Sequence, residues 1–144
     1  GRPYYPSSMI VEGMAQLGGL LIDQQSGFSG RVVLAKIMSS EFFFEALPGD
    51  QLFFHGQIKE QLDIGSVVEG TVHLGDKLQA NVNLMFATLN DDRFNNVQLF
   101  EPAEFCRMIR LLKLFDVGVD QEGNPLQVPQ HMLEAEAAWL LTKN

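Results

Sequence analysis

Cysteine, positive charge and long apolar runs are all scarce in this chain of 144 residues. The single cysteine, Cys106, excludes an internal disulfide. No apolar run free of glycine approaches the roughly 18 residues that a membrane span needs, and no signal peptide is recognisable at the start. We therefore expect no membrane association and a cytoplasmic location.

Basic residues are outnumbered by acidic ones, with 10 Lys and Arg against 18 Asp and Glu and a net charge of −8. This balance argues against a nucleic-acid partner, because binding to a phosphate backbone needs clustered positive charge. No glycine-rich phosphate loop, serine-nucleophile motif or cluster with metal-ligand spacing is present, so we expect neither a cofactor nor a metal. The length and the 46% hydrophobic content indicate a globular domain with a substantial core.

The segment from Ser8 to Ile22 contains one carboxylate, Glu12, among apolar residues that surround the predicted helix. The helix is expected to begin at Ser7 or Ser8, after Pro6, and to end near Ser26-Gly27. Apolar residues on every side predict a helix that is enclosed by other structure, and hence a buried Glu12. A carboxyl group in such surroundings can act as a proton donor, whereas the alternative is a structural glutamate that reaches the surface.

Gln16 lies one helical turn after Glu12 and therefore shares its face. Its amide is the natural group to orient the Glu12 carboxylate. Gly13, Gly18 and Gly19 each weaken the helix in isolation, and glycines inside a helix often mark the close approach of other structure. They predict tight packing against a sheet or a second copy of the chain.

The chain after this helix is rich in β-formers until about residue 90 and then changes character. Alternating apolar and polar residues predict antiparallel strands, and Gly75-Asp76 predicts the turn of a hairpin. Further helices are expected from Glu101 and from about residue 131 to residue 142, the latter burying Leu133, Trp139 and Leu140, with a loop over residues 116–129. The predicted strands are 31–38, 42–47, 51–61, 68–74 and 78–86. The pattern favours an α+β fold in which the sheet curls around the first helix.

Two motifs are more specific than this pattern. The first combines Gly1-Arg2-Pro3-x-x-Pro6 with Ile10-Val11-Glu12-x-Met14-Ala15-Gln16, and the second places Pro48-Gly49-Asp50-Gln51-Leu52 shortly after Phe42. Together with Ile37, they resemble the beta-hydroxyacyl-(acyl-carrier-protein) dehydratases of bacterial fatty-acid synthesis, over roughly the first ninety residues.

The resemblance implies the hotdog fold, a curved antiparallel sheet wrapped around a long central helix. Residues 1–92 would form this domain, with its N-terminal strand missing, and residues 93–144 a helical C-terminal extension packed on it. It also implies a homodimer or a higher homo-oligomer such as a trimer of dimers. The implied reaction is dehydration of a 3-hydroxyacyl thioester, carried by acyl carrier protein or coenzyme A, to a trans-2-enoyl thioester.

The family divides the proton transfers between a glutamate and a histidine of different subunits. Glu12 matches the glutamate, which protonates the departing hydroxyl, and Gln16 matches the residue that hydrogen-bonds it. The backbone amide of Ser7 matches the donor that stabilises negative charge on the thioester carbonyl, a task suited to a helix N-terminus. Glutamate at position 12 favours the simple dehydratases over the branch that also isomerises the double bond, which usually carries aspartate.

Three departures from the family pattern stand out. The histidine belongs to a His-Phe-Pro-Gly sequence whose last residue would be Gly1, so the base is expected just upstream of the sequence. Ser7 replaces a glycine, and Phe43, Phe44 and Glu45 replace basic residues that help to dock the carrier protein.

The three histidines of the chain and Cys106 have simpler interpretations. His55 and His73 occupy the polar phase of alternating strands, and His131 opens the last helix, which indicates exposed or capping positions. Cys106 lies in a helix beside apolar residues and is expected to serve packing. Two alternatives to the dehydratase stay open: a catalytically silent module that binds acyl thioesters or assists assembly, and a hotdog thioesterase.

Overall fold

The computed structural model describes residues 3–28, 31–89, 101–120 and 122–142. It divides into two compact units, residues 1–91 and residues 92–144. The predicted boundary after residue 92 lies outside the described residues, and packing of the second unit on the first stays a prediction. Among the described residues, no helix is both long and apolar enough to cross a membrane.

Helix α1 (Ser7–Gln25) begins directly after Pro6, as predicted. Pro6 carries no side-chain acceptor, and the first turn holds no acidic residue, so Pro6 provides no side-chain cap for the first backbone amides of α1. The helix ends before Gly27, whose φ of +63° is a left-handed conformation that suits glycine.

Four antiparallel strands form the sheet in the order β1-β4-β3-β2: β1 (Val32–Phe42), β2 (Leu52–Leu62), β3 (Gly65–Leu74) and β4 (Lys77–Thr88). The hairpin between β3 and β4 turns at Gly75-Asp76, as predicted, because Leu74 pairs with Lys77. Gly75 has a φ of +57°, which suits the first central residue of a two-residue hairpin turn.

The prediction of two separate strands over residues 31–38 and 42–47 is wrong. Two register shifts, after Leu34 and after Ile37, act as bulges that let one strand, β1, continue to Phe42. The chain then turns instead of extending, because the Leu47 amide donates to Asp50 Oδ2 (2.8 Å) and the Asp50 amide donates to the Leu47 carbonyl (3.0 Å).

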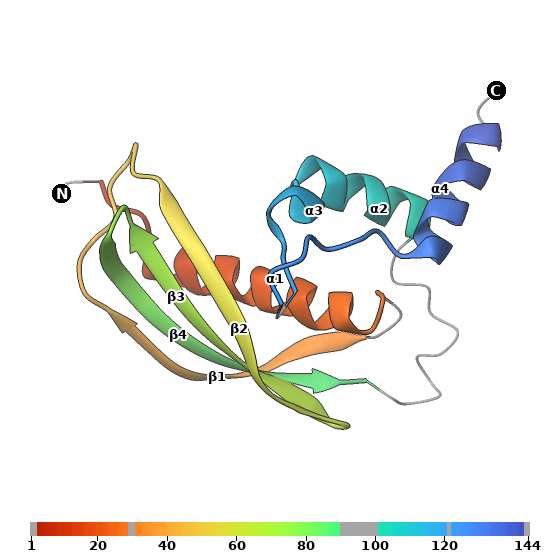
Figure 1. Cartoon of the computed structure of the whole chain (residues 1–144). Helices are drawn as coiled ribbons and strands as arrows, with labels where there is room; N and C mark the ends of the chain where they lie inside the picture. Colours follow the sequence, from red (N-terminus) through yellow and green to blue (C-terminus); the bar gives the residue numbers. More distant parts are fainter. Residues whose placement is uncertain (1–2, 29–30, 90–100, 121, 143–144) are drawn as a thin grey trace. The chain divides into compact units, whose positions relative to one another are not determined.

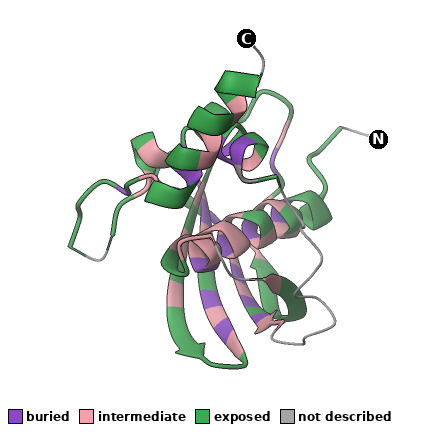
Figure 2. Ribbon diagram, turned by 90° about the vertical axis from the view of Figure 1, so that its right-hand side faces the viewer, coloured by how far each residue is buried: buried purple, intermediate pink, exposed green. Residues whose placement is uncertain are grey.

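Helix α1 crosses one face of the curved sheet and contacts all four strands (Figure 1). Its buried residues contact the inward residues of the strands in a single hydrophobic core, and Figure 2 shows these buried positions along the strands and on α1. The largest core side chains are Ile10, Met14, Ile22, Val68, Val72, Val82, Leu84 and Phe86. A Cβ at Gly18 would lie 2.9 Å from the Phe86 ring, so this glycine marks the predicted close approach.

The prediction that α1 is enclosed on most sides is wrong for the single chain. Its buried positions form one stripe, at Ile10, Met14, Gly18 and Ile22, that faces the sheet. Met9, Glu12 and Gln16 are exposed, because the sheet of this chain covers only one side of the helix. A helix that is apolar around its circumference therefore presents apolar surface away from its own sheet.

The second unit consists of α2 (Pro102–Leu111), α3 (Leu114–Val117) and α4 (Gln130–Thr142). An ion pair of 3.0 Å between Arg110 Nη2 and Glu136 Oε2 joins α2 to α4. Cys106 is buried, as its packing role predicts, and burial raises the pKa of its thiol. The predicted loop over residues 116–129 is wrong at its start, because α3 extends to Val117.

The predicted inward face of α4 is also wrong. Leu133 and Leu140 are exposed, and Met132 is the buried residue of this helix. Trp139 is half-buried and lies under the guanidinium of Arg107, 4.4 Å from the ring centroid. The face of α4 that packs inward therefore differs from the predicted one. Met132 contributes the core side chain, and Trp139 stacks with the cationic side chain of Arg107.

Candidate functional site at the start of helix α1

Glu12 and Gln16 contact each other on the side of α1 that faces away from the sheet. Gln16 Nε2 donates a hydrogen bond to Glu12 Oε1 over 3.1 Å. Both side chains are exposed, so the prediction of a buried Glu12 is wrong for the single chain. Helical geometry explains the contact, because residues four apart are neighbours on one face. The bond holds the Glu12 carboxylate in a defined orientation at the surface of the unit.

Ser7 lies at the first position of α1, beside a cavity of about 250 Å³. The loop before the helix and the segment after β1 both contribute to this cavity, and the Tyr5 amide joins them by donating to the Ala46 carbonyl over 2.7 Å. An uncapped helix N-terminus favours partial negative charge nearby. An oxygen that gains negative charge would therefore be stabilised at the Ser7 end of the cavity.

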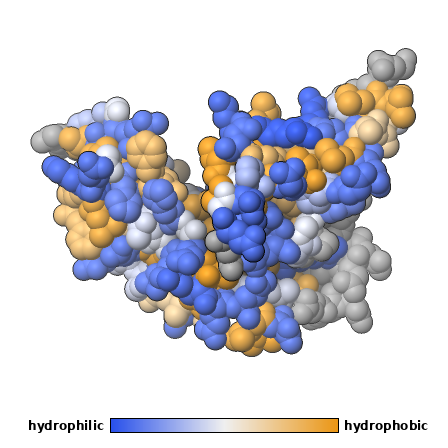
Figure 3. Space-filling model, viewed as in Figure 1, coloured by the Kyte–Doolittle hydropathy of each residue, from blue (hydrophilic) through white to orange (hydrophobic). Residues whose placement is uncertain are grey.

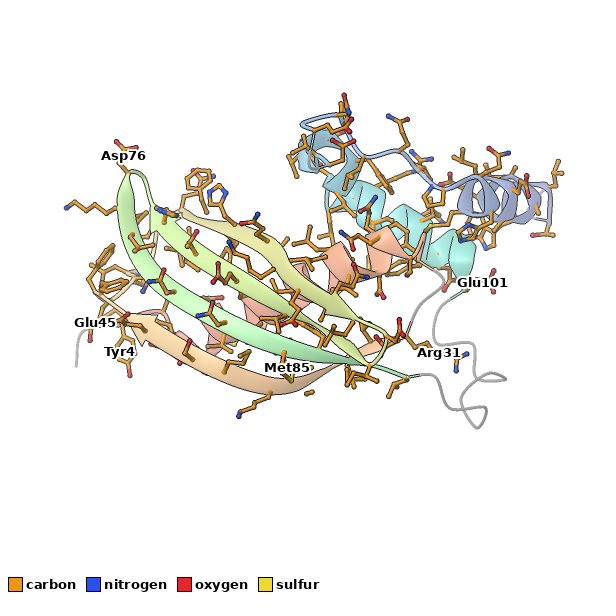
Figure 4. All side chains as sticks on the ribbon, turned by 60° about the horizontal axis from the view of Figure 1, so that its bottom comes forward. Tyr4, Arg31, Glu45, Asp76, Met85 and Glu101 are labelled. Carbon is orange, nitrogen blue, oxygen red and sulfur yellow. The ribbon has the colours of Figure 1, made fainter. Side chains whose placement is uncertain are left out.

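Phe43, Phe44 and Glu45, which the resemblance sets in place of basic residues, line this same cavity. Tyr4 and Glu45 lie at one end of the sheet, and Arg31 lies at the other end (Figure 4). Glu45 is the charged residue of the described lining, and no basic residue belongs to it. The cavity is therefore suited to a neutral or hydrogen-bond-donating group more than to a phosphate.

His55 and His73 lie on the convex face of the sheet, since the inward positions of β2 and β3 are those that alternate with them. Their ring centroids are 5.5 Å apart in an edge-to-face arrangement. Neither ring faces α1, which agrees with the strand phase read from the sequence, and His131 is exposed on α4. Among the described residues, no group of three or more His, Cys, Asp or Glu side chains could hold a metal ion.

Asp23 is a second carboxylate on α1 that the sequence reasoning missed. Burial raises the pKa of Asp23 to about 6, and its Oδ1 atom is buried without a hydrogen-bond partner in the described part of the chain. The signal was present in the sequence, because Asp23 directly follows the apolar run that ends at Ile22. It lies about three turns from Glu12, and no described contact joins the two.

The fold is shared with solved structures that are distant in sequence. A Bacillus halodurans protein solved with CoA matches with a TM-score of 0.54 at 17% identity, covering 60% of this chain and 56% of that one. A conserved protein of Pseudomonas aeruginosa matches with a TM-score of 0.56 at 22% identity, covering 60% of this chain and 67% of that one. A hexameric broad-specificity acyl-coenzyme A thioesterase matches at 0.52 with 16% identity, covering 98% of this chain and 84% of that one. The chain is a hotdog-fold protein.

Sequence comparison identifies the more specific resemblance, although no family model matches the chain. The 3-hydroxyacyl-(acyl-carrier-protein) dehydratase of Symbiobacterium thermophilum is 35% identical over 91 residues, 62% of this chain and 64% of the relative. That of Campylobacter concisus is 34% identical over 91 residues, 58% of this chain and 62% of the relative. The chain thus spans less than two thirds of these curated relatives. The resemblance to the beta-hydroxyacyl dehydratase family read from the first ninety residues is confirmed.

Proposed function

We propose that this protein dehydrates 3-hydroxyacyl thioesters to trans-2-enoyl thioesters, with Glu12 as the proton donor. The observation that carries the proposal is the 3.1 Å hydrogen bond from Gln16 to Glu12, inside the segment that resembles the dehydratases. The backbone of Glu12 lies about 7.5 Å along the helix axis from that of Ser7, given a rise of about 1.5 Å per residue. The Ser7 amide, which would stabilise negative charge, and Glu12, the proposed proton donor, are thus close enough to act on the same substrate.

The reaction needs a base, an acid and a stabilised carbonyl oxygen. The base removes a proton from the carbon next to the thioester carbonyl, and the Ser7 amide stabilises the negative charge that develops on the oxygen. Glu12 then protonates the departing hydroxyl, the carbon–oxygen bond breaks, and water leaves as the double bond forms. For the base we propose the family's histidine, upstream of Gly1, because His55 and His73 lie on the other face of the sheet.

We further propose that the chain acts as a homodimer or a larger assembly of dimers. Strand β1 is an edge of the described sheet, and several of its apolar side chains are exposed: Val33, Leu34, Ile37 and Met38. An uncovered edge strand with apolar side chains favours pairing with a second copy. Pairing along β1 would also bring a second chain beside the exposed side of α1, where Glu12 lies.

The proposed substrate is an acyl group on a pantetheine arm, carried by acyl carrier protein or coenzyme A. Both carriers present the same thioester and the same neutral arm to the cavity near Ser7. The aromatic lining of that cavity provides apolar contact surface for such an arm, and the absence of a basic residue from the described lining disfavours a phosphate there. The protein would act in fatty-acid synthesis or a related acyl-chain synthesis.

Hydrolysis of the same thioester is the second candidate, favoured by the exposure of Glu12. A carboxylate that contacts solvent and is oriented by Gln16 can activate water without a histidine. The third candidate function is binding of the thioester without catalysis.

One assay separates these three functions. The full-length protein is incubated with 3-hydroxybutyryl pantetheine while the absorbance of the enoyl thioester and the release of free thiol are both recorded. Dehydration predicts enoyl absorbance without thiol, whereas hydrolysis predicts thiol without enoyl absorbance. Binding without either product, measured by calorimetry, would support the silent module and contradict the proposed dehydration.

A further inference from the structure

The cavity beside Ser7 contains a buried polar group that the proposed chemistry does not use. Gln79, on β4, lines this cavity together with Ser7, although Gln79 is only 1% exposed. Its Nε2 donates to the Phe44 carbonyl over 2.8 Å, which fixes the orientation of the side-chain amide. Its Oε1 is buried and has no hydrogen-bond partner among the described residues.

An unsatisfied buried carbonyl oxygen is uncommon because it costs the full desolvation of the group. The Gln79 side chain cannot relieve this by turning over, since Nε2 would then lose its acceptor at Phe44. The backbone of Gln79 is also held, because its carbonyl accepts from the Phe43 amide over 2.9 Å. An acceptor is therefore fixed beside the cavity, and a donor from outside the described chain, either a water molecule or a ligand group, can satisfy it.

The surroundings of Gln79 restrict the chemistry of that donor. The lining carries Glu45 and no basic residue, which disfavours an anionic group. Its rings, among them Tyr4, Tyr5 and Phe43, provide flat apolar surface for a slender neutral chain. A cavity of about 250 Å³ holds part of a ligand rather than a whole cofactor. A secondary amide on a flexible chain meets these conditions.

We propose that Gln79 is a specificity-determining residue whose Oε1 accepts a hydrogen bond from an amide N–H of the thioester's pantetheine arm. The proposal rests on the proposed function, since the thioester carbonyl at Ser7 directs the arm into this cavity. Gln79 Oε1 is out of contact with solvent in the unliganded chain, so the arm must displace a lining side chain. Tyr4 and Phe43 are 56% and 49% exposed and have space to turn away.

The test uses two probes that differ in the amide alone. The S-(N-acetylcysteamine) thioester of 3-hydroxybutyrate carries one amide N–H, and the S-pentyl thioester has a chain of the same length without it. Binding of both to the full-length protein is measured by calorimetry, for the unaltered chain and for Gln79→Met. Gln57→Met, at an exposed position on the convex face, is the matched control.

Gln79→Met is expected to reduce the affinity ratio of the amide probe over the pentyl probe by about 2–13-fold, the equivalent of a hydrogen bond of about 0.5–1.5 kcal/mol. Gln57→Met should leave the ratio unchanged. An unchanged ratio in Gln79→Met, with both probes bound, would overturn the role of Gln79 and leave the proposed function standing. Failure of the unaltered protein to bind either probe would overturn both.

A ligand-side measurement keeps the proposal testable if Gln79→Met does not fold. Methylation of the probe's amide nitrogen removes the amide N–H, while the amide carbonyl and the 3-hydroxyl group stay. The unaltered protein should bind the methylated probe more weakly, by at least the same factor. Equal affinity for the two amide probes would contradict the proposed hydrogen bond.

Discussion

Glu12 and Asp23 are two carboxylates on one helix with opposite surroundings. Glu12 is exposed and accepts a hydrogen bond from Gln16, whereas Asp23 has a buried oxygen that no described residue hydrogen-bonds. The difference separates two tasks that a carboxylate can perform. An oriented, accessible group can exchange protons with a substrate, while a buried, unpaired group lowers stability when it ionises.

Glu12→Gln is expected to leave the free energy of unfolding unchanged within about 0.5 kcal/mol, because the side chain is exposed and an amide can still pair with Gln16. Urea denaturation of the two proteins provides the comparison. A loss of more than about 1 kcal/mol would make Glu12 a structural residue.

Asp23→Asn should stabilise the protein at neutral pH and not at acidic pH. The pKa of Asp23 is raised to about 6 in the folded state, so the folded protein holds this proton more tightly than the unfolded chain. Stability is therefore lost as the pH rises from about 4 through about 6, where the folded group ionises. The gain in melting temperature from the substitution should be larger at about pH 7 than at about pH 4. An equal gain at both values would show that ionisation of Asp23 is not the cause.

At the scale of the elements, the glycines of α1 mark where the helix meets the sheet. A Cβ at Gly18 would lie 2.9 Å from the buried Phe86 ring, whereas one at Gly19 would lie 3.9 Å away, an ordinary contact. Gly18 and Gly19 are adjacent glycines of one helix, but only a Cβ at Gly18 would crowd the Phe86 ring. Substitutions at the two positions can therefore be compared directly.

Gly18→Ala is expected to destabilise the protein by about 1–2 kcal/mol. Overpacking costs about 1–3 kcal/mol, and the better helix propensity of alanine offsets about 0.5–1 kcal/mol of that cost. Gly19→Ala should instead stabilise it by about 0.5–1 kcal/mol. Chemical denaturation measures both. The same sign for the two substitutions would mean that Phe86 does not limit the approach of α1.

The elements themselves were largely predictable, because their signals are local. Pro6 begins α1, and Gly75-Asp76 turns the β3–β4 hairpin, as their backbone preferences require. The extension of β1 to Phe42 was not predictable, because its bulges depend on pairing with β4, far away in the sequence. The exposure of Glu12 was missed for a related reason: an all-apolar helix indicates that something covers it, without saying which chain does. Gln79 lacked any local signal, because its cavity is formed by three separate segments.

At the scale of the whole molecule, apolar surface on β1 and on the outer side of α1 is uncovered in the single chain. Figure 3 shows hydrophobic residues reaching the surface among hydrophilic ones on one face of the molecule. Surface of this kind on an edge strand is the basis for the proposed self-association.

Ile37→Lys, on β1, is expected to shift the protein toward the monomer, because a charge in a paired strand edge opposes association. Phe53→Lys, on the other edge strand of the described sheet, is the control, and both side chains are 47% exposed. Analytical ultracentrifugation of the unaltered protein and both variants measures the assembly state. A monomeric unaltered protein, or equal effects of the two substitutions, would contradict pairing along β1.

The most direct measurement is the turnover of 3-hydroxybutyryl pantetheine by the full-length protein and its Glu12→Gln variant, followed through the absorbance of the enoyl product. Glu104→Gln, an exposed glutamate on α2, serves as the control. A proton donor in place contributes about 10²–10⁴-fold, so kcat of Glu12→Gln should fall by that factor while the control keeps its activity. Enoyl formation at the unaltered rate in a folded Glu12→Gln protein would contradict the assignment of Glu12 as the acid.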